Sequence, residues 1–433
     1  MPKVMVVQPV EVLVRIRNSF SSFFKRNFNT NSLKLAIFFA LPIYINFFLL
    51  KYEIGINFYW KILFSVSLLL ALFYLFKEHN WFLSGFLIGV FWFWWIGLSF
   101  RYYGLGFLMP LIVVLIASFY GGVFWIISKI SLKFKKFRKF FLVLFFTFGF
   151  DYITPFSFDW FKPEILFVNS IFGVSKIALL LVFLGVAFYK ELRYFALVLL
   201  VGALFFKNHY PKPPKLDIYL ASTNVSQDKK WDERFIPKEV QNNFKIIKKA
   251  IELKKDVVIL PESAFAMFLN LNDDLMKKLK KLSFKITIIT GALHFKNHKY
   301  YNATYIFEKG KVTILDKHVL VPFGEYIPFP FFQKEINELF FGGGSDYMSA
   351  KKFGIFKIKN YKFINAICYE ATVEDLYKLK PSYVVALSND AWFMPSIMPS
   401  LQEMLIKVYS KKYSKIVYHS INGFKSYTVG ARN

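Results

Sequence analysis

The stretch "NHYPKPPKLDIYLAS" (residues 208–222) divides the chain into halves of different composition. Long apolar runs dominate before it, and short β-branched and aromatic runs alternate with helical patterns after it. Its prolines and flanking basic residues indicate a stiff linker over 208–215, and "KLDIYLAS" reads as a first strand. We therefore expect a basic leader over 1–34, a helical membrane domain over 35–207 and an α/β domain over 216–433.

The composition favours a membrane protein. Hydrophobic residues make up 55% of the chain and the mean hydropathy is +0.39, so there is more apolar surface than one soluble core of this size can bury. The formal net charge of +28 predicts an anionic partner, either nucleic acid or acidic lipid. No nucleic-acid-binding motif or stacking platform occurs in a soluble segment, which excludes nucleic acid. Cys368 is the only cysteine, which excludes an internal disulfide framework.

Apolar segments and basic residues together predict a topology. The first, third and fifth connections between the segments hold only Lys51, Arg101 and Lys162. The second connection carries Lys77, and the leader and the fourth and sixth connections are richer in Lys and Arg. Because the basic side of a membrane protein is cytoplasmic, seven crossings place everything after residue 207 on the outer face. Several segments approach the ~20 residues needed to cross a bilayer core, and the last two are short. The segments are 35–50, 58–76, 81–100, 105–128, 139–157, 174–189 and 193–206.

The second half predicts an α/β domain with polar residues at strand ends. Glu262, Lys317 and Cys368 each follow an apolar run, and such strand ends are where α/β domains tend to build sites. Taken singly, each residue has a simpler interpretation: Cys368 as a small buried hydrophobe, Glu262 as an acid at a helix start, and Lys317 as a solvated surface charge. Together they describe a nucleophile with a base and an electrostatic partner, because a thiol needs such neighbours to become a thiolate. Strands are expected at 215–222, 256–263, 286–293, 383–390 and 415–422, hairpin turns at 308–311 and 359–361, and a helix at 234–254.

Several motifs resemble one known family. "ILPESAF" (259–265), "DKHVLVPFGEYIP" (316–328) and "AICYE" (366–370) resemble the glutamate, lysine and cysteine blocks of the nitrilase superfamily, in the same order. "NVSQDKKWDE" (224–233) and "LSNDAWF" (387–393) resemble its membrane-embedded branch, the apolipoprotein N-acyltransferases of bacterial inner membranes. The resemblance implies a multi-span α-helical membrane domain followed by a nitrilase-like α-β-β-α sandwich on the periplasmic side.

The resemblance also implies roles for individual residues. Glu262 would be the general base, Cys368 the nucleophile that holds the acyl chain as a thioester, and Lys317 the group that stabilises the oxyanion. Supporting roles would fall to the backbone N–H of Tyr369 at the oxyanion, to Glu325 and Glu370 around the lysine, to Trp231 and Trp392 near the substrate cleft, and to a loop over 340–348.

By the same resemblance, the chain would take an acyl group from a phospholipid in the bilayer, phosphatidylethanolamine, and pass it to a diacylated apolipoprotein. This chemistry needs no cofactor and no metal. His294 and His298 have the i,i+4 spacing of a helical metal pair, but we expect them in a turn between strands, which argues against metal binding.

Three alternatives stay open. A membrane-tethered amidase or nitrilase could use the same three residues to hydrolyse a small amide. A transporter or receptor would place buried acids and bases within its spans, where only Lys61 and Asp151 occur. An inactive, C-terminally shortened relative is the third, because the family has an eighth helix after the catalytic domain and no apolar run follows "SINGFKSYTVGARN" (420–433).

Overall fold

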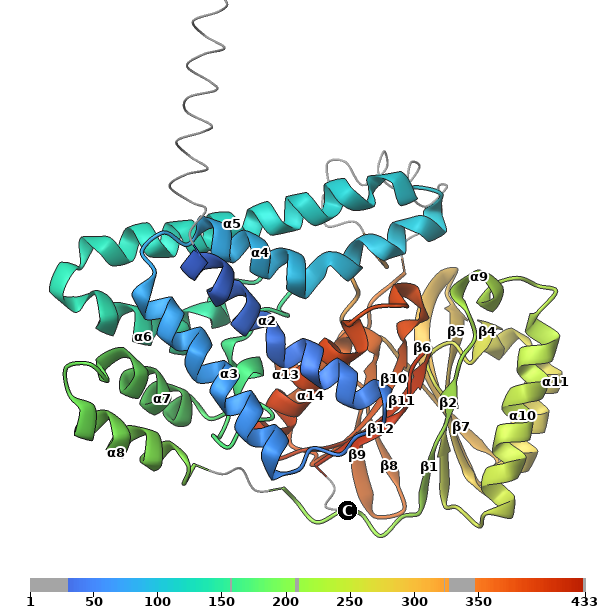
Figure 1. Ribbon diagram of the computed structural model, residues 1–433. Coiled ribbons are helices and arrows are strands. Elements are labelled where there is room, and N and C mark those ends of the chain that lie inside the picture. The colour runs from blue at the N-terminus through green and yellow to red at the C-terminus, as the bar shows by residue number, and fades with distance from the viewer. Residues whose placement is uncertain (1–29, 156–157, 207–209, 323, 327–346, 431–433) are drawn as a thin grey trace, which may run out of the picture.

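The computed structural model describes residues 30–155, 158–206, 210–322, 324–326 and 347–430. Figure 1 shows a body of helices from the first half of the chain beside a body of strands and helices from the second half. The predicted leader lies mostly outside the described residues. Its last part, from Thr30, belongs to the first described helix, because a helix can extend past its apolar run into polar residues.

Among the described residues, four helical stretches are long and apolar enough to cross a membrane: Thr30–Lys51, Phe58–Lys77, Phe82–Tyr103 and Gly106–Lys133. They correspond to the first four predicted segments. The last three segments contain shorter helices of 11, 13 and 11 residues, so their crossing of the bilayer stays a prediction. The helices are α2 (Thr30–Lys51), α3 (Phe58–Lys77), α4 (Phe82–Phe93) continued by the 3-10 helix η1 (Trp94–Tyr103), η2 (Gly106–Leu108) with α5 (Met109–Lys133), α6 (Arg138–Phe148), η4 (Gly149–Tyr152), η6 (Pro163–Phe167), α7 (Lys176–Phe188) and α8 (Arg193–Ala203).

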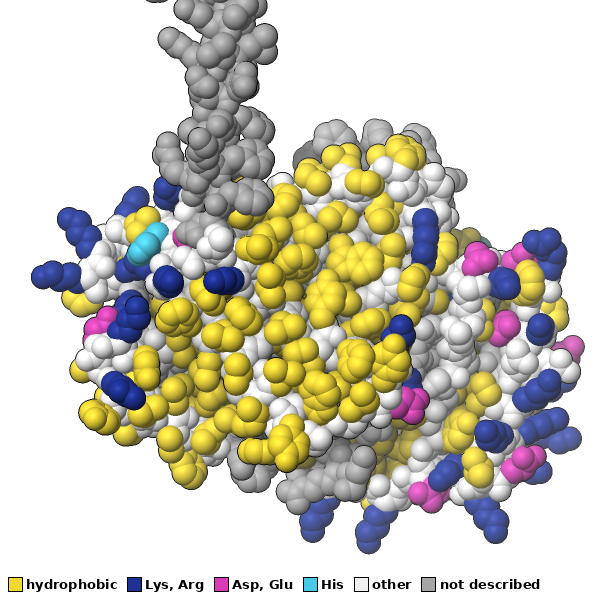
Figure 2. Space-filling model, viewed as in Figure 1, with side chains coloured by type: hydrophobic (Ala, Val, Ile, Leu, Met, Phe, Trp, Pro, Cys, Tyr) yellow, Lys and Arg dark blue, Asp and Glu magenta, His cyan; other side chains and the backbone are white. Residues whose placement is uncertain are grey.

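Helices α4 and α5 pack closely because α4 carries small residues one turn apart. A Cβ atom on Gly85 would lie 2.5 Å from the Tyr120 carbonyl oxygen, and one on Gly89 would lie 2.8 Å from the Ala117 Cα. Small residues at this spacing let membrane helices approach. Outside this packing, apolar side chains cover a continuous face of the helical body, and Lys and Arg gather at its margin (Figure 2). That face is suited to contact lipid.

The second half forms two six-stranded sheets. In the first, parallel strands lead into two antiparallel hairpins, the second of which turns at the predicted 308–311. In the second, the central strands are parallel, and an antiparallel hairpin turns at the predicted 359–361. The first sheet has the order β1 (Ile218–Leu220), β3 (Val257–Ile259), β5 (Thr287–Lys296), β6 (Lys299–Glu308), β7 (Lys311–Asp316), with β4 (Phe265–Phe268) on β5. The second has the order β12 (Tyr427–Val429), β11 (Ile416–Asn422), β10 (Tyr383–Asn389), β9 (Tyr361–Ile367), β8 (Ile355–Ile358), with β2 (Ser222–Thr223) on β11.

The sheets stack face to face with helices on the outer faces. Apolar residues such as Ile259, Ile289 and Leu387 form the core between the sheets. Helices α10 (Ile236–Glu252) and α11 (Asp273–Leu282) pack on the outer face of the first sheet, and α14 (Met398–Tyr413) packs on the second. The predicted fold class, a helical membrane domain followed by an α-β-β-α sandwich, is confirmed.

Helix α14 also joins the two domains through a buried polar network. The Asn46 side chain on α2 donates hydrogen bonds to Ser400 Oγ (3.0 Å) and Glu403 Oε2 (2.9 Å), and its own oxygen accepts one from Asn169 Nδ2 (2.9 Å). All four residues are buried. Buried polar groups need specific partners, so this network fixes the position of α14 on the membrane domain.

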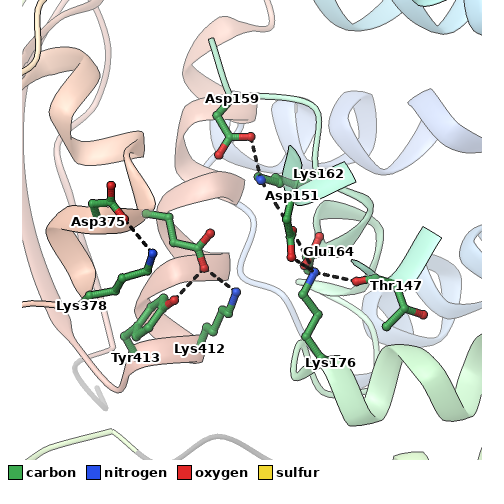
Figure 3. Close-up of polar contacts among 11 residues, drawn as sticks. Thr147, Asp151, Asp159, Lys162, Glu164, Lys176, Asp375, Lys378, Lys412 and Tyr413 are labelled. Carbon is green, nitrogen blue, oxygen red and sulfur yellow. Dashed lines mark hydrogen bonds and ion pairs between the residues drawn. The ribbon is translucent and has the colours of Figure 1, made fainter. Parts of the chain in front are cut away.

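A second, charged cluster lies in the membrane domain next to α14 (Figure 3). The Lys176 ammonium lies 2.9 Å from Asp151 and 2.6 Å from Glu164, and the Lys162 ammonium lies 2.7 Å from Asp159. Asp151, a charged residue within the fifth predicted span, is thus paired within the domain. Across the interface, Glu374 on α13 (Glu374–Tyr377) accepts from Lys412 and Tyr413 of α14 and also interacts with the charge of Lys162.

Candidate active site

The sheet register brings the predicted nucleophile to the carboxyl edge of the second sheet. Strands β9 and β10 run parallel with Ile367 paired to Leu387, so Cys368 leaves its strand beside the end of β10. Its φ angle is +53°, in the left-handed region that non-glycine residues rarely adopt. Such strain persists where surrounding structure fixes it, and it turns the chain sharply directly after the strand.

Glu370 holds this turn and ties it to the segment that carries the lysine. One carboxylate oxygen accepts the backbone N–H of Ile367 (2.7 Å), and the other accepts those of His318 (2.7 Å) and Val319 (3.0 Å). The Glu370 side chain is 1% exposed. Burial raises the pKa of this carboxyl, while Lys317 and the three backbone donors act in the opposite direction. The predicted supporting residue is therefore placed between the nucleophile turn and the lysine segment.

A chain of polar contacts connects the other predicted residues. The buried ammonium of Lys317 forms an ion pair with Glu325 Oε2 at 2.7 Å. Asn302 on β6 donates from one amide nitrogen to both Glu262 Oε1 (2.8 Å) and Glu325 Oε1 (3.1 Å). Lys317 interacts electrostatically with Glu262 and Cys368 as well as with Glu325. The acid, the amine and the thiol that the sequence placed on three strand ends are thus neighbours.

A glycine lets the Glu262 backbone lie against the neighbouring strand. A Cβ atom on Gly291 of β5 would lie 2.7 Å from the Glu262 Cα and 2.5 Å from the Ser263 nitrogen. Real Cβ atoms do not approach so closely, so a side chain at position 291 would displace the acid. The φ angle of Ser263 is +46°, so the chain also turns sharply directly after the acid.

Burial and neighbouring charges together set the protonation of Cys368 and Lys317. Burial and the negative charge of Glu262 raise the pKa of the Cys368 thiol well above its usual range, against the opposing effect of Lys317. The thiol therefore does not stand as a thiolate and needs a base when it reacts. Burial alone would lower the pKa of Lys317, but Glu325, Glu262 and Cys368 raise it, so this lysine stays charged.

The membrane domain packs directly on the nucleophile turn. The Phe158 ring stacks on the Tyr369 ring at 6.4 Å, and Trp160 Nε1 donates to Thr372 Oγ1 at 2.8 Å. Both Tyr369 and Thr372 lie within four residues of Cys368, in the 3-10 helix η9 (Cys368–Thr372). The thiol therefore sits where the two domains meet.

The two predicted substrate-binding tryptophans lie on separate elements. Trp231 follows the short helix α9 (Gln227–Lys230) and is 39% exposed. Trp392 lies in the 3-10 helix η10 (Asp390–Phe393), against Tyr102 at 5.4 Å and Tyr103 at 6.0 Å, both from η1 of the membrane domain. The predicted loop over 340–348 lies outside the described residues up to 346. At its described end, Tyr347 donates its backbone N–H to the Glu325 carbonyl.

The candidate metal pair has a different environment from the one expected. His294 lies within strand β5 rather than in a turn, because the strand runs three residues further than its apolar pattern. Its Nδ1 lies 2.7 Å from Asp316 Oδ1. His298 follows the strand in the tight turn to β6. Over the described part of the chain, no three His, Cys, Asp or Glu side chains form a group that could hold a metal ion.

Three residues near the site were not predicted from the sequence. Asn302 bridges the two acids from the middle of strand β6, where no strand end draws attention to it. Lys230 is 5% exposed although it lies in the charged stretch "QDKKWD". Asp390 follows the strand "VVALSN" and is fully buried, and neither carboxylate oxygen has a hydrogen-bond partner among the described residues. For Lys230 and Asp390, the sequence signal of a role near the site was their position inside the motifs at 224–233 and 387–393.

Comparison with known proteins shows which family the chain belongs to. Residues 26–208 match the family model described as apolipoprotein N-acyltransferase integral membrane domain. The chain is 36% identical over 405 residues to the apolipoprotein N-acyltransferase of Wolinella succinogenes, covering 92% of this chain and 95% of that protein. It is 38% identical over 413 residues to that of Helicobacter pylori, with coverage of 92% and 95%.

Among solved structures, a CN-hydrolase superfamily protein from Xanthomonas campestris is similar, with a TM-score of 0.36 and 14% identity, over 48% of this chain and 76% of that one. The sequence relationships extend over more than nine-tenths of the chain and include both domains. The chain therefore belongs to the apolipoprotein N-acyltransferases, a family of membrane acyltransferases.

Proposed function

We propose that this chain transfers one acyl group from phosphatidylethanolamine to the N-terminal α-amine of a diacylated apolipoprotein, through a thioester on Cys368. The observation that carries the proposal is the position of the thiol. It lies in a strained turn beside an acid and a charged lysine, and the same turn is packed against the membrane domain. A lipid ester could reach such a thiol from the bilayer.

In the first half-reaction, Glu262 takes the proton of the Cys368 thiol as the sulfur attacks the ester carbonyl. Lys317 stabilises the oxyanion that forms, together with the backbone N–H of Tyr369. The C–O bond of the ester then breaks, and Glu262 returns the proton to the leaving lysophospholipid oxygen. The enzyme is left with a thioester.

In the second half-reaction, the α-amine of the acceptor attacks the thioester carbonyl. Glu262 accepts the proton that the amine loses, the C–S bond breaks, and the sulfur regains a proton from Glu262. The products are an amide and the free thiol. Water must be kept from the thioester between the two steps, since hydrolysis would otherwise replace transfer.

The reaction is tested with purified protein in lipid nanodiscs that contain phosphatidylethanolamine of one acyl composition, with and without a synthetic diacylated lipopeptide. Mass spectrometry then quantifies lysophospholipid, free fatty acid and triacylated lipopeptide. We expect sustained lysophospholipid release only with the acceptor, equal in amount to the triacylated product, and none from Cys368→Ser. Steady fatty-acid release without acceptor would instead identify a hydrolase, and turnover by Cys368→Ser would exclude the thioester.

We also propose that the catalytic domain faces the periplasm from a bacterial inner membrane, supported by the alternation of basic connections along the first half. The test uses Cys368→Ser as background and adds Glu252→Cys or Lys136→Cys, both at exposed positions. A thiol reagent that cannot cross membranes should label the first variant in spheroplasts and the second only after lysis. The reverse pattern would contradict the orientation.

A further inference from the structure

The membrane domain contacts the nucleophile turn through one short segment, residues 158–162. The ring of Phe158 lies nearly parallel to the ring of Tyr369, with the centroids 6.4 Å apart and an angle of 6° between the planes. The Trp160 indole is 2% exposed, and its Nε1–H donates a hydrogen bond to Thr372 Oγ1 at 2.8 Å. Thr372 is also buried, so this is a buried polar contact between the two domains.

The Thr372 hydroxyl extends this contact to the residue that follows the nucleophile. A hydroxyl has one proton to donate, and its oxygen can accept at the same time. The Thr372 proton goes to the Tyr369 carbonyl oxygen at 2.7 Å, while the oxygen accepts from Trp160. The backbone of Asp159 forms a further hydrogen bond with the Tyr369 hydroxyl. The segment therefore holds both the ring of Tyr369 and, through Thr372, its main chain.

The membrane domain holds the segment 158–162 in place on its other side. Trp160 packs against Trp95 of η1, with the ring centroids 5.1 Å apart. Within the segment, the Lys162 ammonium lies 2.7 Å from the Asp159 carboxylate (Figure 3). A side chain that is itself fixed by packing and polar contacts can fix a neighbouring group precisely. The support under Tyr369 therefore belongs to the membrane domain.

We propose that Trp160 is a positioning residue supplied by the membrane domain: through Thr372 it fixes the Tyr369 peptide so that the Tyr369 N–H faces the oxyanion on the substrate carbonyl. The inference rests on the roles of Cys368 and Tyr369 in the proposed function. The φ angle of Cys368 is +53°, a conformation that surrounding structure has to hold. Oxyanion donors accelerate a reaction because their direction is fixed before the charge forms.

The size of the expected effect follows from one lost hydrogen bond. Trp160→Phe keeps an aromatic ring in the buried position and removes the donor to Thr372. Removing an oxyanion donor outright lowers the rate by about 10²–10³-fold, and a donor that is only less well held should cost less. We expect the maximum rate of acyl-enzyme formation to fall about tenfold. The half-saturating concentration of phosphatidylethanolamine should stay unchanged, because the contact acts on the transition state.

The experiment compares two reactions of the same thiol in the full-length protein. Acylation by phosphatidylethanolamine passes through an oxyanion, whereas alkylation by iodoacetamide displaces iodide at a saturated carbon and forms no oxyanion. In Trp160→Phe, acylation should fall about tenfold while alkylation stays within about twofold of wild type. Trp81→Phe is the matched control, because Trp81 is also buried in the membrane domain and its Nε1–H donates to the Glu78 carbonyl at 3.0 Å. Both rates of this control should equal those of wild type.

Three results would overturn the inference. The first is a wild-type acylation rate in Trp160→Phe. The second is an equal fall in acylation and alkylation, which would mark general damage to the turn rather than a loss at the oxyanion. The third is an equal fall of acylation in Trp81→Phe.

Variants of Thr372 test whether the indole acts through the hydroxyl. Thr372→Ser keeps both hydrogen bonds and should be acylated like wild type, whereas Thr372→Val removes both and should be at least as slow as Trp160→Phe. Adding Trp160→Phe to Thr372→Val should cause no further loss, since the two residues act through one connection. A second loss of the same size would overturn the connection. If Trp160→Phe does not fold, Thr372→Val and Thr372→Ser carry the test.

Failure of the proposed function can be recognised separately. If phosphatidylethanolamine does not acylate the wild type, p-nitrophenyl butyrate replaces it as the donor. Glu262 then takes the thiol proton, the sulfur bonds to the carbonyl carbon, the C–O bond of the ester breaks, and nitrophenolate leaves. This reaction also forms an oxyanion, so the same fall in Trp160→Phe would support the inference while the lipid donor is refuted. A wild-type thiol that neither ester acylates would overturn both.

Discussion

Glu325→Gln removes the charge that faces the buried lysine while nearly preserving the shape of the side chain. One Glu325 oxygen accepts from Lys317 (2.7 Å) and from the Val321 N–H (2.9 Å), and the other accepts from Asn302 (3.1 Å). A glutamine can accept on one side only, so its amide nitrogen must face a donor, either the Lys317 ammonium or the Asn302 amide. The substitution therefore removes either the contact with Lys317 or the contact with Asn302.

The magnitude follows from the burial of Lys317, which is 1% exposed. Removing one member of a buried ion pair costs about 3–5 kcal/mol, because the remaining charge is left unpaired. If that cost falls on the charge that stabilises the oxyanion, the rate of acyl-enzyme formation drops between about 10² and 10⁴-fold. Glu325 also raises the pKa of Lys317, so the variant favours loss of the lysine proton.

The assay is single-turnover acylation of Cys368, followed by intact mass, with Glu374→Gln as the matched control. Glu374 also pairs with a lysine, Lys412, but this pair joins helices α13 and α14 and does not include Lys317. We expect Glu374→Gln to lower thermal stability and leave the acylation rate close to wild type. A Glu325→Gln rate within about threefold of wild type, under 1 kcal/mol by the same conversion, would refute this account of the lysine.

Two further predictions concern buried polar groups. Asn46→Leu leaves the Glu403 carboxylate without its interdomain donor and should lower the free energy of unfolding by about 3 kcal/mol. The thermal midpoint in detergent should therefore be lower than that of wild type and of the exposed-site control Asn224→Leu. An unchanged midpoint would contradict the docking role of the network. Burial and the charge of Glu262 raise the pKa of Asp390 well above its usual range, so the folded protein holds a proton that the unfolded chain releases as pH rises above the usual range of an aspartate. The wild type therefore loses stability as pH rises over this range, and Asp390→Asn removes that loss of stability. The thermal midpoint of Asp390→Asn relative to wild type should rise between about pH 5 and about pH 8. A constant difference would mean that the acid is ionised in the fold.

The residues of the candidate site that could be named from the sequence are those that stand at strand ends. Glu262, Lys317 and Cys368 stand directly after apolar runs, and parallel strands bring such ends together. Asn302 was not predicted as a site residue because its position inside a strand gives no such signal. Lys230 was not predicted to be buried because adjacent lysines in a sequence are usually exposed to solvent. Only the attachment of α9 through Gln227 turns one of them inward.

The fold was predictable to the same degree. Helix α14 was not predicted because 12 of its 16 residues are buried, between the second sheet and the membrane domain, which removes the amphipathic pattern of a surface helix. The fifth predicted segment, 139–157, proved to be a short helix followed by the 3-10 turn η4. Its polar residue Asp151 is held there by Lys176, a contact that hydropathy along one segment does not reveal.

The central claim is that Cys368 carries the acyl group between two lipids. The measurement that tests it most directly is intact mass of the protein after incubation with phosphatidylethanolamine, with peptide mapping of the adduct and a chase with diacylated lipopeptide. We predict a gain of one acyl chain located on the peptide that contains Cys368, cleared by the lipopeptide with formation of its triacylated product. An adduct on any other residue, or a wild-type protein that gains no mass while its thiol still reacts with iodoacetamide, would contradict the account.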